Sequence, residues 1–212
     1  GNALALGHLV HAVEDHGDHA AVDLYAVDLG GLAQPRDPVA LGEHLPGRKI
    51  LAVQRIGKFI CIELSRCGEI ATDSIADLHL LVHLGMTGRL AVRPPGEAIV
   101  PHTHGFFELD DGKELRYTDI RRFGRILLVP GTGLREFQNH LGHDALFISA
   151  RDFTREVLRR RTRIKAFLLD QTALRGMGNI YADESLWRAR IHPAWLAASL
   201  SPEEIARLHQ AM

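Results

Sequence analysis

Residues 164–193 read IKAFLLDQTALRGMGNIYADESLWRARIHP, and they determine how the second half of the chain is interpreted. The stretch predicts a helix, a glycine-rich turn and a second helix. Gly176 and Gly178 permit unusual backbone dihedral angles and leave backbone amides open. Together with Asn179 they begin the second helix, whose N-terminus can hold a phosphate group. A GxGN motif alone is a weak signal, but the length of this pattern makes it specific.

The flanking sequence is also typical of helices. Residues 150–162 (ARDFTREVLRRRT) place Phe153, Val157 and Leu158 at helical spacing. Ser201 followed by Pro202 and two glutamates predicts a helix start, with serine as the N-cap and acidic residues in the first turn. Residues 134–142 (LREFQNHLG) predict a short helix that Gly142 closes. The second half is therefore predicted to be helical.

The first half has the pattern of short β-strands instead. Alternating, β-branched runs such as KILAVQRIG (49–57) and KFICIELS (58–65) predict strands, and five similar runs follow up to residue 131. Asp111-Gly112 lies between two of these runs and predicts a tight hairpin. We therefore expect an α+β protein with a β-sandwich-like first half. The predicted divisions are an atypical N-terminal segment (1–36), a β-sandwich catalytic-type domain (37–135) and a helical DNA-binding domain (136–212).

Composition excludes some classes of protein and leaves others open. The chain has 212 residues, 46% of them apolar, which is enough for a buried core. No apolar run of about 18 residues predicts a membrane span, and no basic region precedes the apolar N-terminus. The two cysteines, Cys61 and Cys67, are too few for a disulfide framework or a four-cysteine zinc site. Net charge is −1, but residues 151–190 carry ten Lys or Arg against five Asp or Glu, which fits either a phosphate-binding surface or a solvated helix face.

Two motifs in the first half carry candidate functional residues. Lys58 follows RIG at the start of a strand, where a lysine is most often a solvated edge residue. The motif HLGMTG spans His83 to Gly88, and its two glycines place Met86 either on an exposed turn or, as is more usual for methionine, in the core.

Two further motifs contain histidine and arginine. His102 and His104 are two residues apart, so on a strand they face the same side and form either a metal-binding pair or donors to phosphate oxygens. The sequence Arg121-Arg122-Phe123-Gly124 suits nucleic acid, since arginine pairs with phosphate or a base edge and an aromatic ring can enter a base stack. The alternative places Phe123 in the core.

Together these motifs resemble the formamidopyrimidine-DNA glycosylase family. The resemblance covers about Gly47 to Met212, and its motifs occur in the order found in that family. They are GRKILAVQRIGK, HLGMTG, HTH, LRYTDIRRFG, LGHDAL and the block LLDQTALRGMGNIYADESLWRARIHP, which ends at Pro193. The last block resembles the family's helix-two-turn-helix. HLGM, RRFG and GNIYA favour the branch that acts on oxidised purines over the endonuclease VIII branch.

The resemblance implies binding of damaged double-stranded DNA that is kinked, with the damaged nucleotide turned out of the stack. Met86, Arg121 and Phe123 would fill or flank the vacated space, with Arg121 facing the orphaned base and Phe123 wedged beside it. Lys58 matches a residue that also transfers a proton during strand cleavage. Glu184 lies where the family has a buried acid. The phosphates around the kink would be held by Lys58, His83, His102, Arg122, Lys165 and Asn179.

In the family the nucleophile is an N-terminal proline, whose secondary amine attacks C1′ with help from a neighbouring glutamate. We find no such Pro-Glu pair before Lys58. Pro35 and Pro38 are internal, so their nitrogens are amides and cannot act as the nucleophile. The family's four-cysteine zinc finger is not found either, so we expect no metal site in this chain although zinc is the family's cofactor.

We therefore expect an enzyme of base-excision repair, a glycosylase for 8-oxoguanine and formamidopyrimidines with abasic-site lyase activity. The alternative is a catalytically inactive protein that binds damaged DNA. We expect a cytoplasmic monomer that does not contact membranes.

Overall fold

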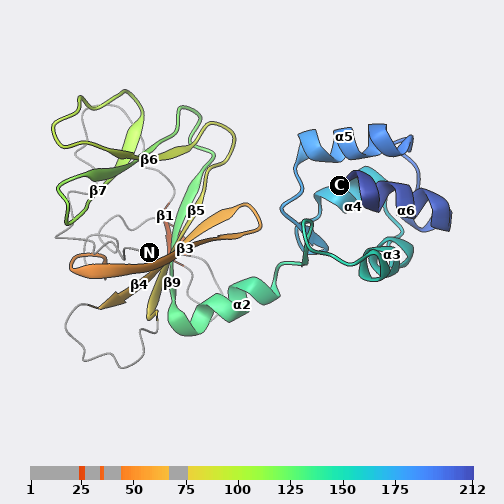
Figure 1. Cartoon of the computed structure of the whole chain (residues 1–212), viewed down its shortest axis with the longest axis horizontal. Helices are drawn as coiled ribbons and strands as arrows, with labels where there is room; N and C mark the ends of the chain where they lie inside the picture. The colour runs from red at the N-terminus through yellow and green to blue at the C-terminus, as the bar shows by residue number, and fades with distance from the viewer. Residues whose placement is uncertain (1–23, 27–33, 36–43, 67–75) are drawn as a thin grey trace. The chain divides into compact units, whose positions relative to one another are not determined.

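The computed structural model describes residues 24–26, 34–35, 44–66 and 76–212. The chain divides into two compact units, Gly1–Glu136 and Phe137–Met212, and each is considered by itself (Figure 1). Most of the predicted atypical segment (1–36), together with Cys67, lies outside the described residues. Within the described ranges, no helix has the length and apolar character needed to cross a membrane.

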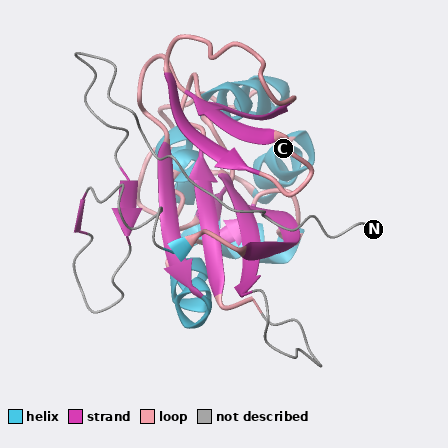
Figure 2. Cartoon of the chain, turned by 90° about the vertical axis from the view of Figure 1, so that its left-hand side faces the viewer, coloured by secondary structure: helices cyan, strands magenta, loops and turns pink. Residues whose placement is uncertain are grey.

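The larger sheet of the first unit has six strands in the order β2-β1-β9-β5-β4-β3 (Figure 2). All neighbours are antiparallel except β1 and β9, which are parallel. Strand β5 has the sequence LHLLVH and is buried along nearly its whole length, which accounts for its four apolar residues. The strands are β1 (Leu24–Ala26), β2 (Gln34–Pro35), β3 (Arg48–Ile56), β4 (Phe59–Arg66), β5 (Leu78–His83) and β9 (Arg125–Pro130).

The smaller sheet has three antiparallel strands in the order β6-β8-β7, namely β6 (Arg89–Arg93), β8 (Glu114–Thr118) and β7 (Thr103–Glu108). The predicted Asp111-Gly112 turn lies between β7 and β8: Gly112 has φ of +76° and its amide donates to the Leu109 carbonyl at 2.9 Å. Glycine takes this left-handed conformation without the Cβ penalty that other residues incur.

One hydrophobic cluster joins the two sheets and makes the unit sandwich-like. Leu64 and Leu80 contribute from the larger sheet, while Phe107 and Tyr117 contribute from the smaller one, and all four are buried. The predicted β-sandwich-like half is therefore confirmed. Cys61, on β4, is a buried free thiol. Burial, and then the nearby charge of Glu63, raise its pKa to about 11.

The second unit is helical, as predicted. Its elements, with the short helices that lead into it, are η1 (Gly131–Gly133), α2 (Leu134–Asn139), β10 (His143–Asp144), α3 (Ala150–Arg159), α4 (Ile164–Leu169), β11 (Leu174–Arg175), α5 (Asn179–Ala189), η2 (Ala197–Ser199) and α6 (Pro202–Ala211).

Side-chain caps begin two of these helices. Ser201 accepts a hydrogen bond from the Glu204 amide and Glu204 accepts one from the Ser201 amide, which completes the capping box at the predicted start of α6. Ser149 caps α3 through its side chain, which accepts a hydrogen bond from the Asp152 amide. The prediction that Gly142 closes α2 is wrong: that helix ends at Asn139. Gly142 instead lies against Ala173, so close that a Cβ would lie 2.2 Å from the Ala173 carbonyl.

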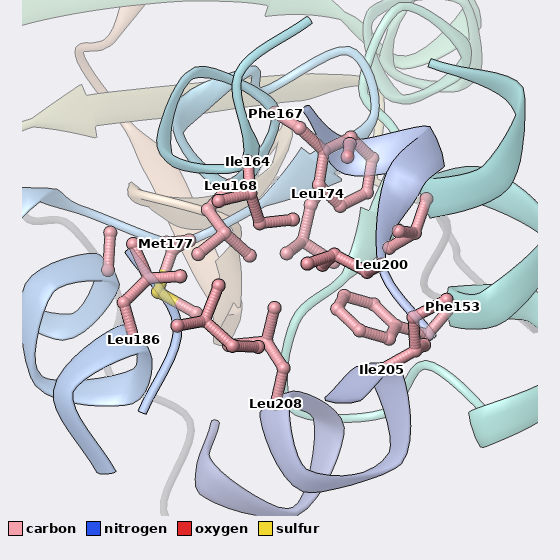
Figure 3. Close-up of a cluster of buried hydrophobic side chains, with 14 of the residues drawn as sticks. Phe153, Ile164, Phe167, Leu168, Leu174, Met177, Leu186, Leu200, Ile205 and Leu208 are labelled. Atoms are coloured by element: carbon pink, nitrogen blue, oxygen red, sulfur yellow. The ribbon is translucent and has the colours of Figure 1, made fainter. Parts of the chain in front are cut away.

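The core of the second unit is built from the faces that helices α3 to α6 turn inward (Figure 3). Phe153 of α3 and Phe167 of α4 have ring centroids 6.0 Å apart, and Leu186, Ile205 and Leu208 complete the cluster. Both tryptophans of the chain lie outside this core, since Trp187 is 81% exposed and Trp195 is 47% exposed.

Candidate nucleic-acid interface

Two loops of the first unit meet and present most of the candidate residues. Loop 84–88 follows β5 and is closed by a hydrogen bond from the Gly88 amide to the Leu84 carbonyl at 2.8 Å. Gly85 has φ of +61°, and a Cβ there would lie 2.7 Å from the Gly124 nitrogen. Only glycine therefore allows loop 84–88 to approach loop 119–124 so closely.

The buried carboxylate of Asp119 ties these loops together. Its Oδ1 accepts hydrogen bonds from the Thr87 hydroxyl and, at 3.2 Å, from the Arg121 amide. Its Oδ2 accepts from the Gly124 amide at 2.8 Å and from the Tyr117 hydroxyl at 3.1 Å. Burial acts to raise the pKa of Asp119, but the hydrogen bonds, led by the one from Thr87, outweigh it and the pKa lies below its ordinary value. Asp119 is thus a charged anchor only 1% exposed, which the motif analysis did not single out.

The tips of the two loops place Met86, Arg121 and Phe123 beside one another. The Arg121 guanidinium contacts the Met86 sulfur at 3.6 Å, and its carbon lies 4.7 Å from the centre of the Phe123 ring. Met86 is 71% exposed and Phe123 is 52% exposed, so the alternatives that placed them in the core are wrong. An exposed methionine, arginine and phenylalanine in contact form a surface suited to entering a base stack.

His83 and Lys58 lie at the base of loop 84–88. The Gly85 amide donates to Nδ1 of His83 at 3.1 Å, so in the neutral ring the proton is on Nε2, which can donate to a ligand. Burial first, and then the charges of Lys58 and Arg125, lower the pKa of His83. Burial also lowers the pKa of Lys58. No hydrogen bond or ion pair with another described residue engages the Lys58 ammonium, which leaves it available to an anion.

His102 and Arg122 have left-handed backbones, with φ of +64° and +54°. Such conformations in residues other than glycine cost on the order of 1 kcal/mol and concentrate at functional sites. The carbonyl of His102 accepts a hydrogen bond from the Asp119 amide at 3.0 Å, which links this turn to the same anchor.

The expectation that His102 and His104 share a strand face is wrong. Strand β7 begins only at Thr103, and its pairing shifts between Thr103 and Gly105. His104 donates through Nε2 to the Asp119 carbonyl at 2.9 Å, so its ring supports the loop. Among the described residues no group of three or more His, Cys, Asp or Glu side chains is placed to hold a metal ion, and two cysteines do not fit a four-cysteine zinc finger.

The second unit carries Lys165 and Asn179 on either side of the glycine turn. Gln171 fixes this turn, because its amide nitrogen donates to the Leu169 and Met177 carbonyls, each at 3.0 Å. Its amide oxygen accepts from the Gly176 amide at 3.0 Å. Asn179 is then exposed as the first residue of α5.

Lys165, on α4, forms an ion pair with Asp183 of α5, with the ammonium 2.7 Å from Oδ1. Asp183 was not anticipated, although it is the residue next to Glu184 in the motif. Glu184 itself is exposed, so the prediction that it is a buried acid is wrong. Seven of the nine candidate residues belong to the first unit, while Lys165 and Asn179 belong to the second.

Comparison with known proteins agrees with this geometry. Residues 7–126 match the formamidopyrimidine-DNA glycosylase N-terminal domain, and residues 141–212 match the H2TH domain of the same family. A formamidopyrimidine-DNA glycosylase of Herpetosiphon aurantiacus is 40% identical over 90% of this chain and 69% of its own length. That of Pelotomaculum thermopropionicum is 45% identical over 80% of this chain and 59% of its own length.

Solved structures give the same result. Lactococcus lactis Fpg in complex with DNA containing an abasic site superimposes with a TM-score of 0.72 and 28% identity, over 82% of this chain and 61% of that one. The chain thus spans about 60 to 70% of the length of these relatives. With one family's two domain models matching in order, and with relatives at 40 to 45% identity, the chain belongs to the formamidopyrimidine-DNA glycosylase family.

Proposed function

We propose that the chain serves base-excision repair as a DNA glycosylase that binds kinked, damaged duplex DNA. The observation that carries the proposal is the exposed cluster of Met86, Arg121 and Phe123 on two loops tied to one buried carboxylate. A base can be turned out of a duplex only if something stabilises the vacated stack, and unstacking costs a few kcal/mol. Because Asp119 already fixes the backbone of the loops that carry these side chains, little of the loop structure has to be ordered when DNA binds.

Phosphate contacts keep the duplex in register with these loops. Lys58 supplies a compact positive charge, while the lowered pKa of His83 keeps its ring neutral and able to donate through Nε2. His102 and Arg122 lie on turns that adjoin the same loops. In the second unit, Asn179 at the start of α5 and Lys165 beside Asp183 form the other set of donors.

For the substrate and the reaction, we propose that the enzyme removes oxidised purines and then cleaves the strand at the resulting abasic site. This proposal is supported by solved complexes of the Lactococcus lactis relative, which hold DNA with an abasic site in one case and Fapy-dG in another. Within this chain, Lys58 is the candidate for proton transfer during strand cleavage, since partial burial lowers the pKa of its amine and no described residue pairs with it.

The test is incubation with duplex DNA that contains 8-oxoguanine opposite cytosine, with and without borohydride. Base release together with a trapped covalent complex supports a glycosylase with lyase activity. Base release without trapping retains the glycosylase and contradicts the lyase. Binding to an abasic-site duplex with neither product supports the alternative of a non-catalytic protein that binds damaged DNA, whereas failure to bind contradicts both.

A further inference from the structure

The outer face of the smaller sheet carries an arginine cluster apart from the loops. Along β6 the side chains alternate, so Leu90 faces the core while Arg89, Ala91 and Arg93 face the other way. On the neighbouring strand β8, Tyr117 faces the core, and Arg116 pairs with Ala91 in register. The outer face therefore gathers three guanidinium groups over adjacent strands.

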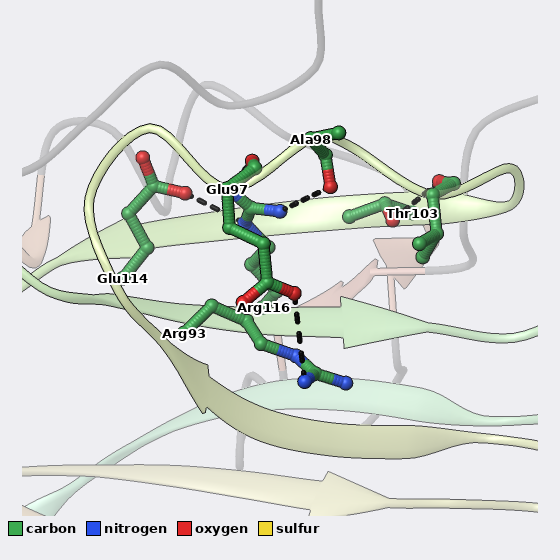
Figure 4. A network of polar contacts seen from close by, with 7 residues as sticks. Arg93, Glu97, Ala98, Thr103, Glu114 and Arg116 are labelled. Atoms are coloured by element: carbon green, nitrogen blue, oxygen red, sulfur yellow. Dashed lines mark hydrogen bonds and ion pairs between the residues drawn. The ribbon is translucent and has the colours of Figure 1, made fainter.

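These side chains line a cavity of about 100 Å³, together with Glu97, Val100 and Thr118. Arg116 forms its floor and is only 4% exposed. Its guanidinium donates to Glu114 Oε2 at 2.7 Å and to the carbonyls of Ala98 and Glu97 at 3.0 and 2.6 Å (Figure 4). A buried cation at the base, with Arg89 and Arg93 beside it, is an arrangement suited to an anion.

The charges around the cavity do not cancel. Glu114 pairs with Arg116 at 2.7 Å, and Glu97 pairs with Arg93 at the longer distance of 3.5 Å. No hydrogen bond or ion pair within the described part of the chain engages the Arg89 guanidinium, which is exposed at the rim. The Thr118 hydroxyl is likewise unengaged by described residues. One positive charge thus exceeds the two carboxylates, and it lies beside a hydroxyl donor.

The position of the cavity indicates what kind of anion reaches it. Arg89 directly follows Gly88, the last residue of the loop that carries Met86, and Thr118 directly precedes Asp119. The part of the cavity lined by Arg89 and Thr118 therefore adjoins loops 84–88 and 119–124, while Arg93 lines it at the far end of β6. The cavity volume of about 100 Å³ leaves room for a group the size of a phosphate.

We propose that Arg89, Arg93 and Thr118 form a phosphate-binding site that holds a backbone phosphate of the duplex beside the kinked segment. The proposal rests on the proposed DNA-binding function and extends its contact surface along the smaller sheet. Arg116 serves as the fixed floor, because its donors are already engaged by Glu114 and the two carbonyls.

The experiment measures duplex binding by fluorescence anisotropy across a range of salt concentrations. It compares the unmodified chain, the double variant Arg89→Gln/Arg93→Gln, and Lys113→Gln as a control. Lys113 lies on the β7–β8 hairpin, in an ion pair with Asp111 and outside the residues that line the cavity, so the control also loses a positive charge. Each lost phosphate contact lowers the slope of log K against log salt by about 0.9. We expect the slope of the double variant to fall by about one to two and its affinity by on the order of ten-fold, with little change in the control.

A second measurement separates the site from the DNA proposal. Inorganic phosphate, added at constant ionic strength against chloride, should raise the Tm of the unmodified chain and not that of the double variant. An unchanged salt slope in the double variant overturns the assignment to DNA. If the unmodified chain itself fails to bind duplex DNA, the proposed function fails. A rise in Tm with phosphate that is seen in the unmodified chain and not in the double variant then still supports an anion site. If phosphate raises the Tm of neither protein, the anion site is overturned too.

Discussion

The two units support their candidate DNA-contacting residues by different chemistry. In the first unit, a buried charge at Asp119 gathers four donors from three segments of chain. In the second unit, the neutral amide of Gln171 bridges its own turn from within. A buried carboxylate is costly to leave half-satisfied, whereas an amide can be lost with less disturbance. We therefore expect a substitution at Asp119 to lower the free energy of unfolding more than a substitution at Gln171.

The largest effect is expected for Asp119→Ala. The substitution leaves the Gly124 amide and the hydroxyls of Thr87 and Tyr117 without their acceptor, at a cost of about 3–5 kcal/mol in the free energy of unfolding. Urea denaturation followed by circular dichroism measures it. Asp111→Ala, on the exposed β7–β8 hairpin, is the control and should change stability little. A loss below about 1 kcal/mol in Asp119→Ala contradicts the anchoring role.

The same anchor predicts how stability depends on pH. Because the folded pKa of Asp119 lies below its ordinary 3.8, its contribution is present above that value and is lost as pH falls through the folded pKa. Asp170 of the second unit also has a lowered pKa, since hydrogen bonds led by that from Thr172 outweigh its burial. The free energy of unfolding should therefore fall less steeply with falling pH in Asp119→Asn and in Asp170→Asn than in the unmodified chain. An unchanged titration in either variant contradicts the prediction for that carboxyl.

Gly85→Ala should have the next largest effect, lowering the free energy of unfolding by roughly 2–3 kcal/mol. The new Cβ would lie 2.7 Å from the Gly124 nitrogen, so loops 84–88 and 119–124 would have to separate. Position 85 also has a left-handed backbone, which alanine adopts only with strain. Gly112→Ala is the matched control, since Gly112 also has a positive φ but nothing lies within 4 Å of its Cβ position. The difference between their unfolding free energies isolates the contact between the loops. Equal values would show that the loops do not depend on it.

Gln171→Ala should cost about 1–2 kcal/mol, since it removes three hydrogen bonds but leaves no buried charge. We expect weaker DNA binding as well, because Asn179 at the end of this turn loses its fixed position. Thermal denaturation and anisotropy measure the two effects. Thr172→Ala, which leaves the Gln171 bridges intact, serves as the comparison for DNA affinity.

Phe123→Ala should have the smallest effect on stability, about 0.5 kcal/mol or less, because half of the ring is exposed. Its effect on binding to abasic-site duplex should be larger, at about ten- to hundred-fold, since a stacked ring contributes roughly 1–3 kcal/mol. Phe123→Trp retains an aromatic ring and should recover most of the affinity. Equal affinities for all three proteins would contradict the wedge role.

Strand patterns and turn residues were predictable because local sequence determines them. The Asp111-Gly112 hairpin and the Ser201 capping box are examples in which the residues that make the bonds are neighbours in sequence. The candidate residues Met86, Arg121 and Phe123 were also found from motifs. What the motifs did not reveal is that they touch, because this depends on pairing between loops some 35 residues apart.

Other features depended on tertiary contacts that no local pattern encodes. Asp119 looked like an ordinary polar residue after a strand, and only the fold surrounds it with donors from Thr87 and Gly124. His102 leaves the strand pattern because its backbone is left-handed. On α5 the partner of Lys165 is Asp183, while the neighbouring Glu184 faces solvent, a choice between adjacent residues that depends on how α4 packs against α5.

The placement of Cys61 and the two tryptophans gives the chain a built-in pair of probes, one for each unit. A buried thiol with a pKa of about 11 is almost entirely protonated near neutrality and resists alkylation until β4 opens. Trp187 and Trp195 both belong to the second unit, so tryptophan fluorescence reports on that unit alone. Pulsed alkylation mapped to Cys61 and tryptophan emission can therefore follow the opening of each half separately in a single unlabelled sample.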